Sequence, residues 1–124
     1  MRKQPTASEL AILRVLWTLG PSTVREVHER LDAVKPTGYT TVLKLLQIMT
    51  EKNLVRRDEK ERAHVYRARL PQDQTQSALV RDLVDKVFSG SASRLVMHAL
   101  SDKRATAEEL AEIRRLLDDM EGDK

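Results

Sequence analysis

The sequence predicts a mainly α-helical protein with one small β-hairpin, divided into an N-terminal domain of residues 1–70 and a C-terminal helical domain of residues 71–124. Apolar residues recur at helical spacing in six segments of the chain. Two short runs of strand-forming residues flank a charged turn between the third and fourth of these segments. The charge also changes sign near residue 70. Residues 1–70 hold 14 Lys and Arg against 8 Asp and Glu (net +6), whereas residues 71–124 hold 8 against 11 (net −3).

Capping signals delimit the first two helices. Thr6 is followed three residues later by Glu9, which is the spacing of a capping box, and the apolar stripe behind it stops at Gly20. The same spacing recurs at Thr23 and Glu26 and predicts a shorter second helix. The proline at position 36 ends that helix before residue 35, because proline disfavours helical backbone in the residue that precedes it.

The third predicted helix begins near Gly38, ends near Asn53 and carries two different faces. One face has apolar residues at the spacing that seats a helix on a core: Val42, Leu45, Leu46 and Met49. The opposite face is polar and consists of Thr40, Thr41, Lys44, Gln47 and Glu51. Threonine, lysine and glutamine side chains can reach base edges in DNA. A stripe that merely faces solvent is the alternative interpretation.

Two short strands and a charged turn follow. Residues 55–58 and 63–68 are the predicted strands, and residues 59–62 are the turn between them. Basic residues crowd this hairpin: Arg56, Arg57, Lys60, Arg62, Arg67 and Arg69. Three helices followed by such a hairpin are the order of a winged helix-turn-helix, in which basic side chains beside the third helix contact phosphates. As an alternative, Lys60 and Arg62 only offset the two glutamates of an exposed turn.

Residues 71–124 contain three further amphipathic segments and little material for a core. The first runs to Ser89 and is ended by Gly90, the second covers residues 92–100, and the third opens at a capping box of Thr106 and Glu109. These 54 residues include one aromatic side chain, and a domain of that size rarely buries enough apolar surface by itself. A second copy of the chain is the predicted partner, through an interface of Leu79, Leu83, Val87, Phe88, Leu95, Val96, Leu110, Ile113 and Leu117. Packing onto the N-terminal half is the alternative.

Composition excludes several classes of site. The chain has no cysteine, so it has no disulfide, no thiolate metal site and no cysteine nucleophile. Its three histidines, His28, His64 and His98, share no ligand-like spacing, and we expect neither a metal nor a cofactor. The sequence has no apolar run of about 18 residues and no charged-then-apolar leader. We therefore expect a soluble cytoplasmic protein that is not exported.

An enzyme is the least favoured function. The chain has 4 Gly and no Gly-rich phosphate loop, and none of its candidate nucleophiles has an obvious base. Ser91 and His98 lie on neighbouring segments but lack an orienting carboxylate. The stronger competitor to DNA binding is a winged helix that docks another protein through the polar face of its third helix.

Several motifs, in this order, resemble the BlaI/MecI/CopY family of bacterial repressors. They are LAILRVLW at 10–17, VREV at 24–27, YTTV at 39–42, KNLV at 52–55 and VY at 65–66, followed by VFSGS at 87–91 and LV at 95–96. The family implies a winged-helix DNA-binding domain, a helical dimerisation domain and repression by a homodimer on a dyad operator. Its third helix enters the major groove of double-stranded operator DNA. With the basic hairpin included, the expected DNA-binding residues are Thr40, Thr41, Lys44, Gln47, Arg57, Lys60 and Arg62.

The chain departs from the family pattern where specificity is expected to lie. Relatives often carry threonine in place of Lys44, arginine in place of Ile48, and Gly-Arg in place of Glu61 and Arg62. The resemblance therefore carries over the fold and the manner of repression, but not the operator sequence or the regulated genes.

Two further departures concern regulation. Copper-responsive members carry cysteine pairs near the C-terminus, so the absence of cysteine excludes copper sensing by such a tail. The β-lactam members are inactivated when a membrane-embedded sensor metalloprotease signals cleavage of an Asn-Phe bond, and the aligned residues here are His98 and Ala99. The known scissile pair is absent, so a sensor-metalloprotease pathway with cleavage elsewhere in this helix is a hypothesis.

Overall fold

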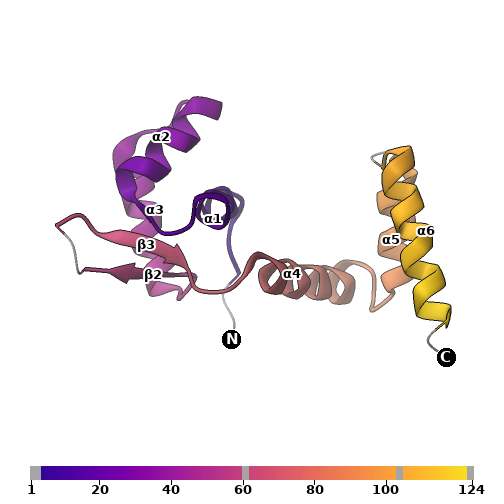
Figure 1. Cartoon of the computed structure of the whole chain (residues 1–124). Coiled ribbons are helices and arrows are strands. Elements are labelled where there is room, and N and C mark those ends of the chain that lie inside the picture. Colours follow the sequence, from indigo (N-terminus) through magenta and orange to yellow (C-terminus); the bar gives the residue numbers. More distant parts are fainter. Residues whose placement is uncertain (1–3, 60–61, 103–104, 123–124) are drawn as a thin grey trace. The chain divides into compact units, whose positions relative to one another are not determined.

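The computed structural model describes residues 4–59, 62–102 and 105–122, and the chain divides into two compact units, Met1–Leu79 and Val80–Lys124. The fold is mainly helical with one small sheet, as predicted (Figure 1). The first unit contains α1 (Ala7–Leu19), β1 (Ser22–Thr23), α2 (Val24–Val34), α3 (Tyr39–Glu51), β2 (Val55–Asp58) and β3 (Val65–Ala68). The boundary between the units falls within α4 (Gln72–Val87), and the second unit continues with α5 (Ala92–Ser101) and α6 (Ala107–Gly122).

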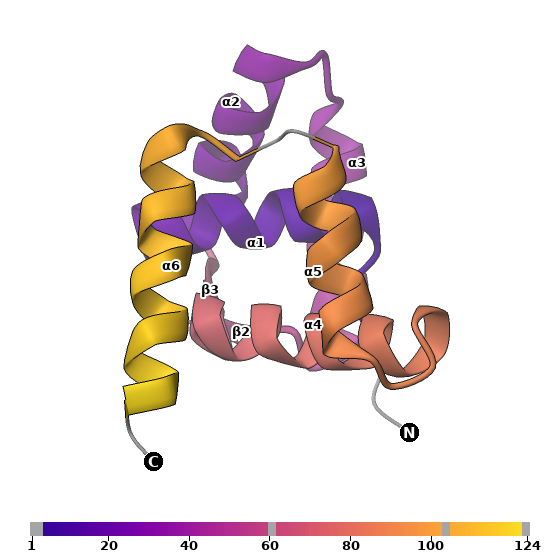
Figure 2. The ribbon, with the colours of Figure 1, turned by 90° about the vertical axis from the view of Figure 1, so that its right-hand side faces the viewer.

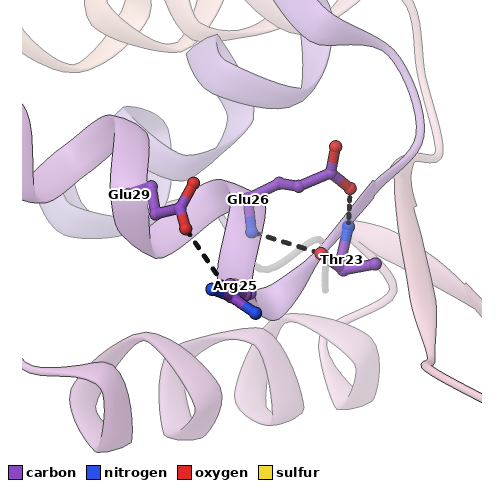
Figure 3. Close-up of polar contacts among 4 residues, drawn as sticks. All are labelled: Thr23, Arg25, Glu26 and Glu29. Carbon is purple, nitrogen blue, oxygen red and sulfur yellow. Dashed lines mark hydrogen bonds and ion pairs between the residues drawn. The ribbon is translucent and has the colours of Figure 1, made fainter.

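Both predicted capping boxes of the first unit are confirmed. The N–H of Glu9 donates to Thr6 Oγ1 (3.2 Å), and the N–H of Thr6 donates to Glu9 Oε1 (2.8 Å). The same reciprocal pair joins Thr23 and Glu26, at 3.2 and 2.9 Å (Figure 3). Each box satisfies N–H groups that the start of a helix leaves unpaired, so α1 and α2 begin where the sequence predicts.

A Schellman motif around Asn53 ends α3. Asn53 adopts a left-handed φ of 64°, which confirms the predicted cap. The N–H of Leu54 donates to the carbonyl oxygen of Met49 (2.9 Å), and the N–H of Asn53 donates to that of Thr50 (3.1 Å). The motif turns the chain directly into β2, whose first residue, Val55, is buried.

The predicted hairpin is part of a three-stranded antiparallel sheet with the order β1-β3-β2. Ser22 and Thr23 form the additional strand β1 and pair with Tyr66 and Val65 of β3. Two residues are too few to show strand periodicity, and Thr23 is also the N-cap of α2, so the sequence shows only its capping signal. The sequence predicted a strand over residues 63–68, but β3 begins only at Val65.

A single apolar core holds the first unit together. It is built from α1, α2, α3 and the sheet: Ile12, Leu13, Val15, Leu16, Val24, Val27, Val42, Leu46, Met49, Val55 and Tyr66. The predicted packing face of α3 is confirmed, because Val42, Leu46 and Met49 are fully buried and Leu45 is half-buried. Since one face of α3 is fixed inward, its opposite face is held outward.

The end of α4 differs from the prediction. The helix stops at Val87 and not at Ser89. Ser89 and Gly90 both adopt left-handed φ angles, of 51° and 86°. The N–H of Gly90 donates a hydrogen bond to the carbonyl oxygen of Val84 (2.9 Å), which satisfies one carbonyl group in the last turn of the helix.

The side chains of the three C-terminal helices are much less buried than those of the first three helices. Figure 2 shows α5 and α6 running in opposite directions. Among the described residues of α4, α5 and α6, none is buried. Ser91 caps α5 with its side chain, and the third predicted capping box, Thr106 with Glu109, is confirmed at α6. Across the described ranges, each helix is too short or too polar to cross a membrane.

Candidate nucleic-acid interface

The outward face of α3 presents the side chains predicted to contact DNA. Thr40, Thr41, Lys44 and Gln47 are all exposed. In the part of the chain that the structure describes, none of these side chains makes a hydrogen bond or an ion pair. A helix that is held on the core by one face and presents unpaired polar groups on the other is suited to enter a groove and bond to base edges.

The start of α3 is tied to α2. His28 Nε2 lies 2.8 Å from the carbonyl oxygen of Thr37, and the His28 ring meets the edge of the Tyr39 ring with centroids 5.7 Å apart. The N–H of Thr37 donates to Asp32 Oδ1 (2.9 Å). These contacts fix the turn between the two helices. The N-cap of α3, Gly38, offers no side-chain acceptor, so the first N–H groups of α3 are not capped by a side chain.

The end of α3 is tied to α1 by a shielded ion pair. Lys52 Nζ lies 2.6 Å from Glu9 Oε1, and the Glu9 side chain is 3% exposed. Burial by itself raises the pKa of the Glu9 carboxyl, but the Lys52 ammonium and the hydrogen bonds with Thr6 outweigh it, so the pKa is lowered. The carboxylate is therefore charged at neutral pH, and α3 is anchored at both of its ends.

The hairpin formed by β2, β3 and the turn between them is the wing of the winged helix. The contacts predicted for the wing fall into three cases. Arg57 is exposed, but its Nη2 lies 2.5 Å from Glu59 Oε1, so this guanidinium already has a carboxylate partner. Arg62 is exposed and makes no ion pair with any described residue. Lys60 lies outside the described residues. The pairing of Glu59 with Arg57 was not anticipated from the sequence, which suggested offsetting only within the turn.

The strand register separates the arginines of the wing into two groups. Arg57 aligns with the buried Tyr66 and therefore leaves the sheet on its core-facing side. Arg56 aligns with Arg67 on the other side, and both are exposed. Arg56 and Arg67 belong to the basic cluster that the sequence predicts on the hairpin, but they were not among the expected DNA contacts. The alternation of side chains along β3, counted from Tyr66, is the signal that separates them.

The predicted dimer-interface residues are accessible. Four are half-buried: Leu79, Phe88, Leu95 and Ile113. The other five are exposed: Leu83, Val87, Val96, Leu110 and Leu117. The rings of Phe88 and His98 pack together with centroids 5.5 Å apart. Apart from such local contacts, the apolar side chains of these helices remain largely open to solvent.

Comparison with known proteins agrees with the fold. The family model for the penicillinase repressor matches residues 5–119. Two similar proteins are both named transcriptional regulator BlaI and come from Mycobacterium tuberculosis, strains CDC 1551 / Oshkosh and ATCC 25618 / H37Rv. Each is 36% identical over 115 residues, which cover 91% of this chain and 82% of the relative. The chain therefore belongs to the penicillinase repressor family, the BlaI family of transcriptional repressors.

Proposed function

We propose that this repressor binds DNA sequence-specifically as a homodimer, with α3 of each protomer in the major groove of one half of a dyad operator. The observation that supports this best is the outward face of α3. Its polar side chains have no partner among the described residues: Thr40, Thr41, Lys44 and Gln47. Hydroxyl and amide groups can bond to base edges, and an ammonium group can donate to a base or to an adjacent phosphate.

The basic hairpin supports a second set of contacts. We assign Arg57, Lys60 and Arg62 to backbone phosphates, which fix the position of the protein on the duplex without reading sequence. Arg57 and Arg62 are exposed beside the winged-helix core, and Lys60 lies between them in the chain. Binding by Arg57 requires its guanidinium to leave Glu59 or to share it with a phosphate.

The homodimer is assigned to residues 71–124, and DNA binding to residues 1–70. The described residues of α4, α5 and α6 include no buried side chain, although their apolar stripes are those of packed helices. A two-fold interface of these stripes would cover them. It would also present two α3 helices to major grooves about 34 Å apart, or a multiple of that distance.

An inducing signal relieves repression in this proposal, and cleavage within the dimerisation domain, signalled through a sensor metalloprotease, is the route to test first. His98 and Ala99 in α5 are exposed. Incubation of the purified protein with its cognate sensor protease tests this route. A chain that stays intact throughout induction would rule it out.

Selection of DNA from a random pool by the full-length protein, followed by mobility shifts at two salt concentrations, tests the proposed function. We expect a dyad motif. Its affinity should fall roughly a thousandfold or more between about 50 and 200 mM salt if about 6–10 phosphates are contacted. Weak binding without a motif, with a shallow dependence on salt, would instead favour docking of a protein partner on the same face of α3.

A further inference from the structure

The solvent side of the wing carries two arginines that lie directly opposite each other, and this arrangement favours the binding of an anion. Arg56 of β2 and Arg67 of β3 are Cα partners in the antiparallel ladder, so their side chains leave the sheet opposite each other. Val55 and Tyr66, their neighbours along the strands, are each 1% exposed and point to the core. Because side chains alternate along a strand, Arg56 and Arg67 share the solvent side of the sheet.

This arrangement opposes the stability of the free protein. Directly opposed side chains have Cβ atoms about 4.5–5.5 Å apart, and like charges in that position are destabilising. Neither guanidinium makes a hydrogen bond or an ion pair with the described residues. Asp58, the one carboxylate within β2 and β3, lies on this side, diagonally from Arg67. The next carboxylate along the chain, Glu59, is paired with Arg57.

We propose that Arg56 and Arg67 together bind one backbone phosphate of the DNA duplex. A guanidinium donates hydrogen bonds in a planar fork that fits phosphate oxygens, and two opposed forks bring two positive charges to one anion. The phosphate also relieves the repulsion between the two guanidinium groups. The site recognises charge and not sequence, and it lies at a hollow that Arg57, Asp58 and Glu59 also line. The inference rests on the proposed function, because the duplex supplies the phosphate.

The test uses Arg56→Gln, Arg67→Gln and the double variant in the full-length protein. Arg115→Gln in α6 is the matched charge control, because Arg115 is exposed and has no ion pair in the described part of the chain. Without DNA and at low salt, the unfolding midpoints of the two single variants should be no lower than that of the wild type. Each single variant should bind the selected operator and a random duplex roughly tenfold more weakly than the control does.

The salt slope and the double variant sharpen the test. The salt slope is the slope of the logarithm of DNA affinity against the logarithm of salt concentration. Loss of one phosphate contact should make this slope shallower by about one unit. The double variant should bind little more weakly than either single variant, because both side chains hold the same phosphate.

Two results would overturn the inference. One is an affinity for both duplexes that matches the Arg115→Gln control, with or without a lowered unfolding midpoint. The other is a changed motif at one base position, which would make the arginine a base reader. Failure of the proposed function is distinguishable. A wild-type protein without a preferred motif, whose random-duplex binding still weakens in Arg56→Gln, keeps the phosphate site but not the specific operator.

Discussion

Lys52 and Glu9, 43 residues apart in the chain, form a shielded ion pair in which Nζ of Lys52 lies 2.6 Å from Oε1 of Glu9. The same carboxylate oxygen accepts the N–H of Thr6. One side chain therefore caps the start of α1 and holds the end of α3. The position of the helix proposed to enter the groove thus depends on a residue outside that helix.

Replacing Lys52 by methionine should destabilise the protein by about 2 to 4 kcal/mol, because the Glu9 carboxylate stays shielded from water without its charge partner. Lys86→Met is the matched control. Lys86 pairs with Asp82 at 3.1 Å, but its side chain is 72% exposed, so its loss should cost less than about 1 kcal/mol. Chemical denaturation measures both variants. Equal losses would mean that the Lys52 pair contributes no more than a surface pair.

Acidification should remove the stability that Glu9 contributes. Burial opposes ionisation, but the Lys52 ammonium and the Thr6 hydrogen bonds outweigh it and lower the pKa of Glu9 below its ordinary 4.5. The unfolded chain therefore takes up this proton at a higher pH than the folded protein does. The contribution is complete above the ordinary pKa and is lost as the pH falls through the lowered one.

Unfolding free energies of the wild type and of Glu9→Gln, measured in urea from neutral pH to about pH 3, follow this contribution. The wild type should be the more stable protein at neutral pH, and the two curves should converge below the ordinary pKa of Glu9. Curves that run parallel over the whole range would show that Glu9 is not the group responsible.

The features that the sequence predicts are those whose signals are local. Thr6 with Glu9, and Thr23 with Glu26, each hold a complete capping signal within four residues. Asn53 is a residue type that tolerates the left-handed conformation in which it is found. The two faces of α3 follow from a periodicity that covers the whole helix, so they too could be assigned before the structure was known.

Contacts between distant segments could not be predicted. The indole N–H of Trp17 donates to the carbonyl oxygen of Leu70 (3.0 Å), 53 residues away, and nothing in either local sequence marks the pair. The candidate site also depends on a contact between distant segments. The basic residues of the wing could be identified, but the alignment of Arg56 with Arg67 depends on the strand register, and a shift by one residue would reverse the side on which each lies.

Glu59→Gln should strengthen DNA binding roughly threefold to tenfold, because it releases the Arg57 guanidinium and removes a negative charge from the wing. Asp82→Asn is the matched control, since it releases Lys86 and removes the same charge from α4 instead of from the wing. Anisotropy titrations of the operator and of a random duplex measure the effect. Equal gains in the two variants would assign it to net charge and not to Arg57.

Lys44→Ala distinguishes the two contacts open to that side chain. If the ammonium donates to a base, the variant should select a different nucleotide at one position of the operator and lose about 1–3 kcal/mol there. If it contacts a phosphate, all sites should weaken alike and the salt slope should flatten by about one unit. Lys86→Ala in α4 is the control for charge. No change relative to that control would place α3 in an orientation other than the one proposed.

Leu117→Gln should weaken the proposed dimer without unfolding the protomer. Leu117 is 52% exposed, so the substitution costs the isolated chain little. In a two-fold interface the change occurs twice, and loss of about 1 kcal/mol per copy would raise the dissociation constant roughly thirtyfold. Val34→Gln is the matched control, because Val34 is 89% exposed at the end of α2 and outside the predicted interface. Sedimentation equilibrium over a range of concentrations measures both, and operator binding of Leu117→Gln should weaken in parallel. A dimer that tolerates Leu117→Gln as well as it tolerates Val34→Gln would exclude this stripe of α6 from the interface, and a wild type that remains monomeric would exclude the dimer itself.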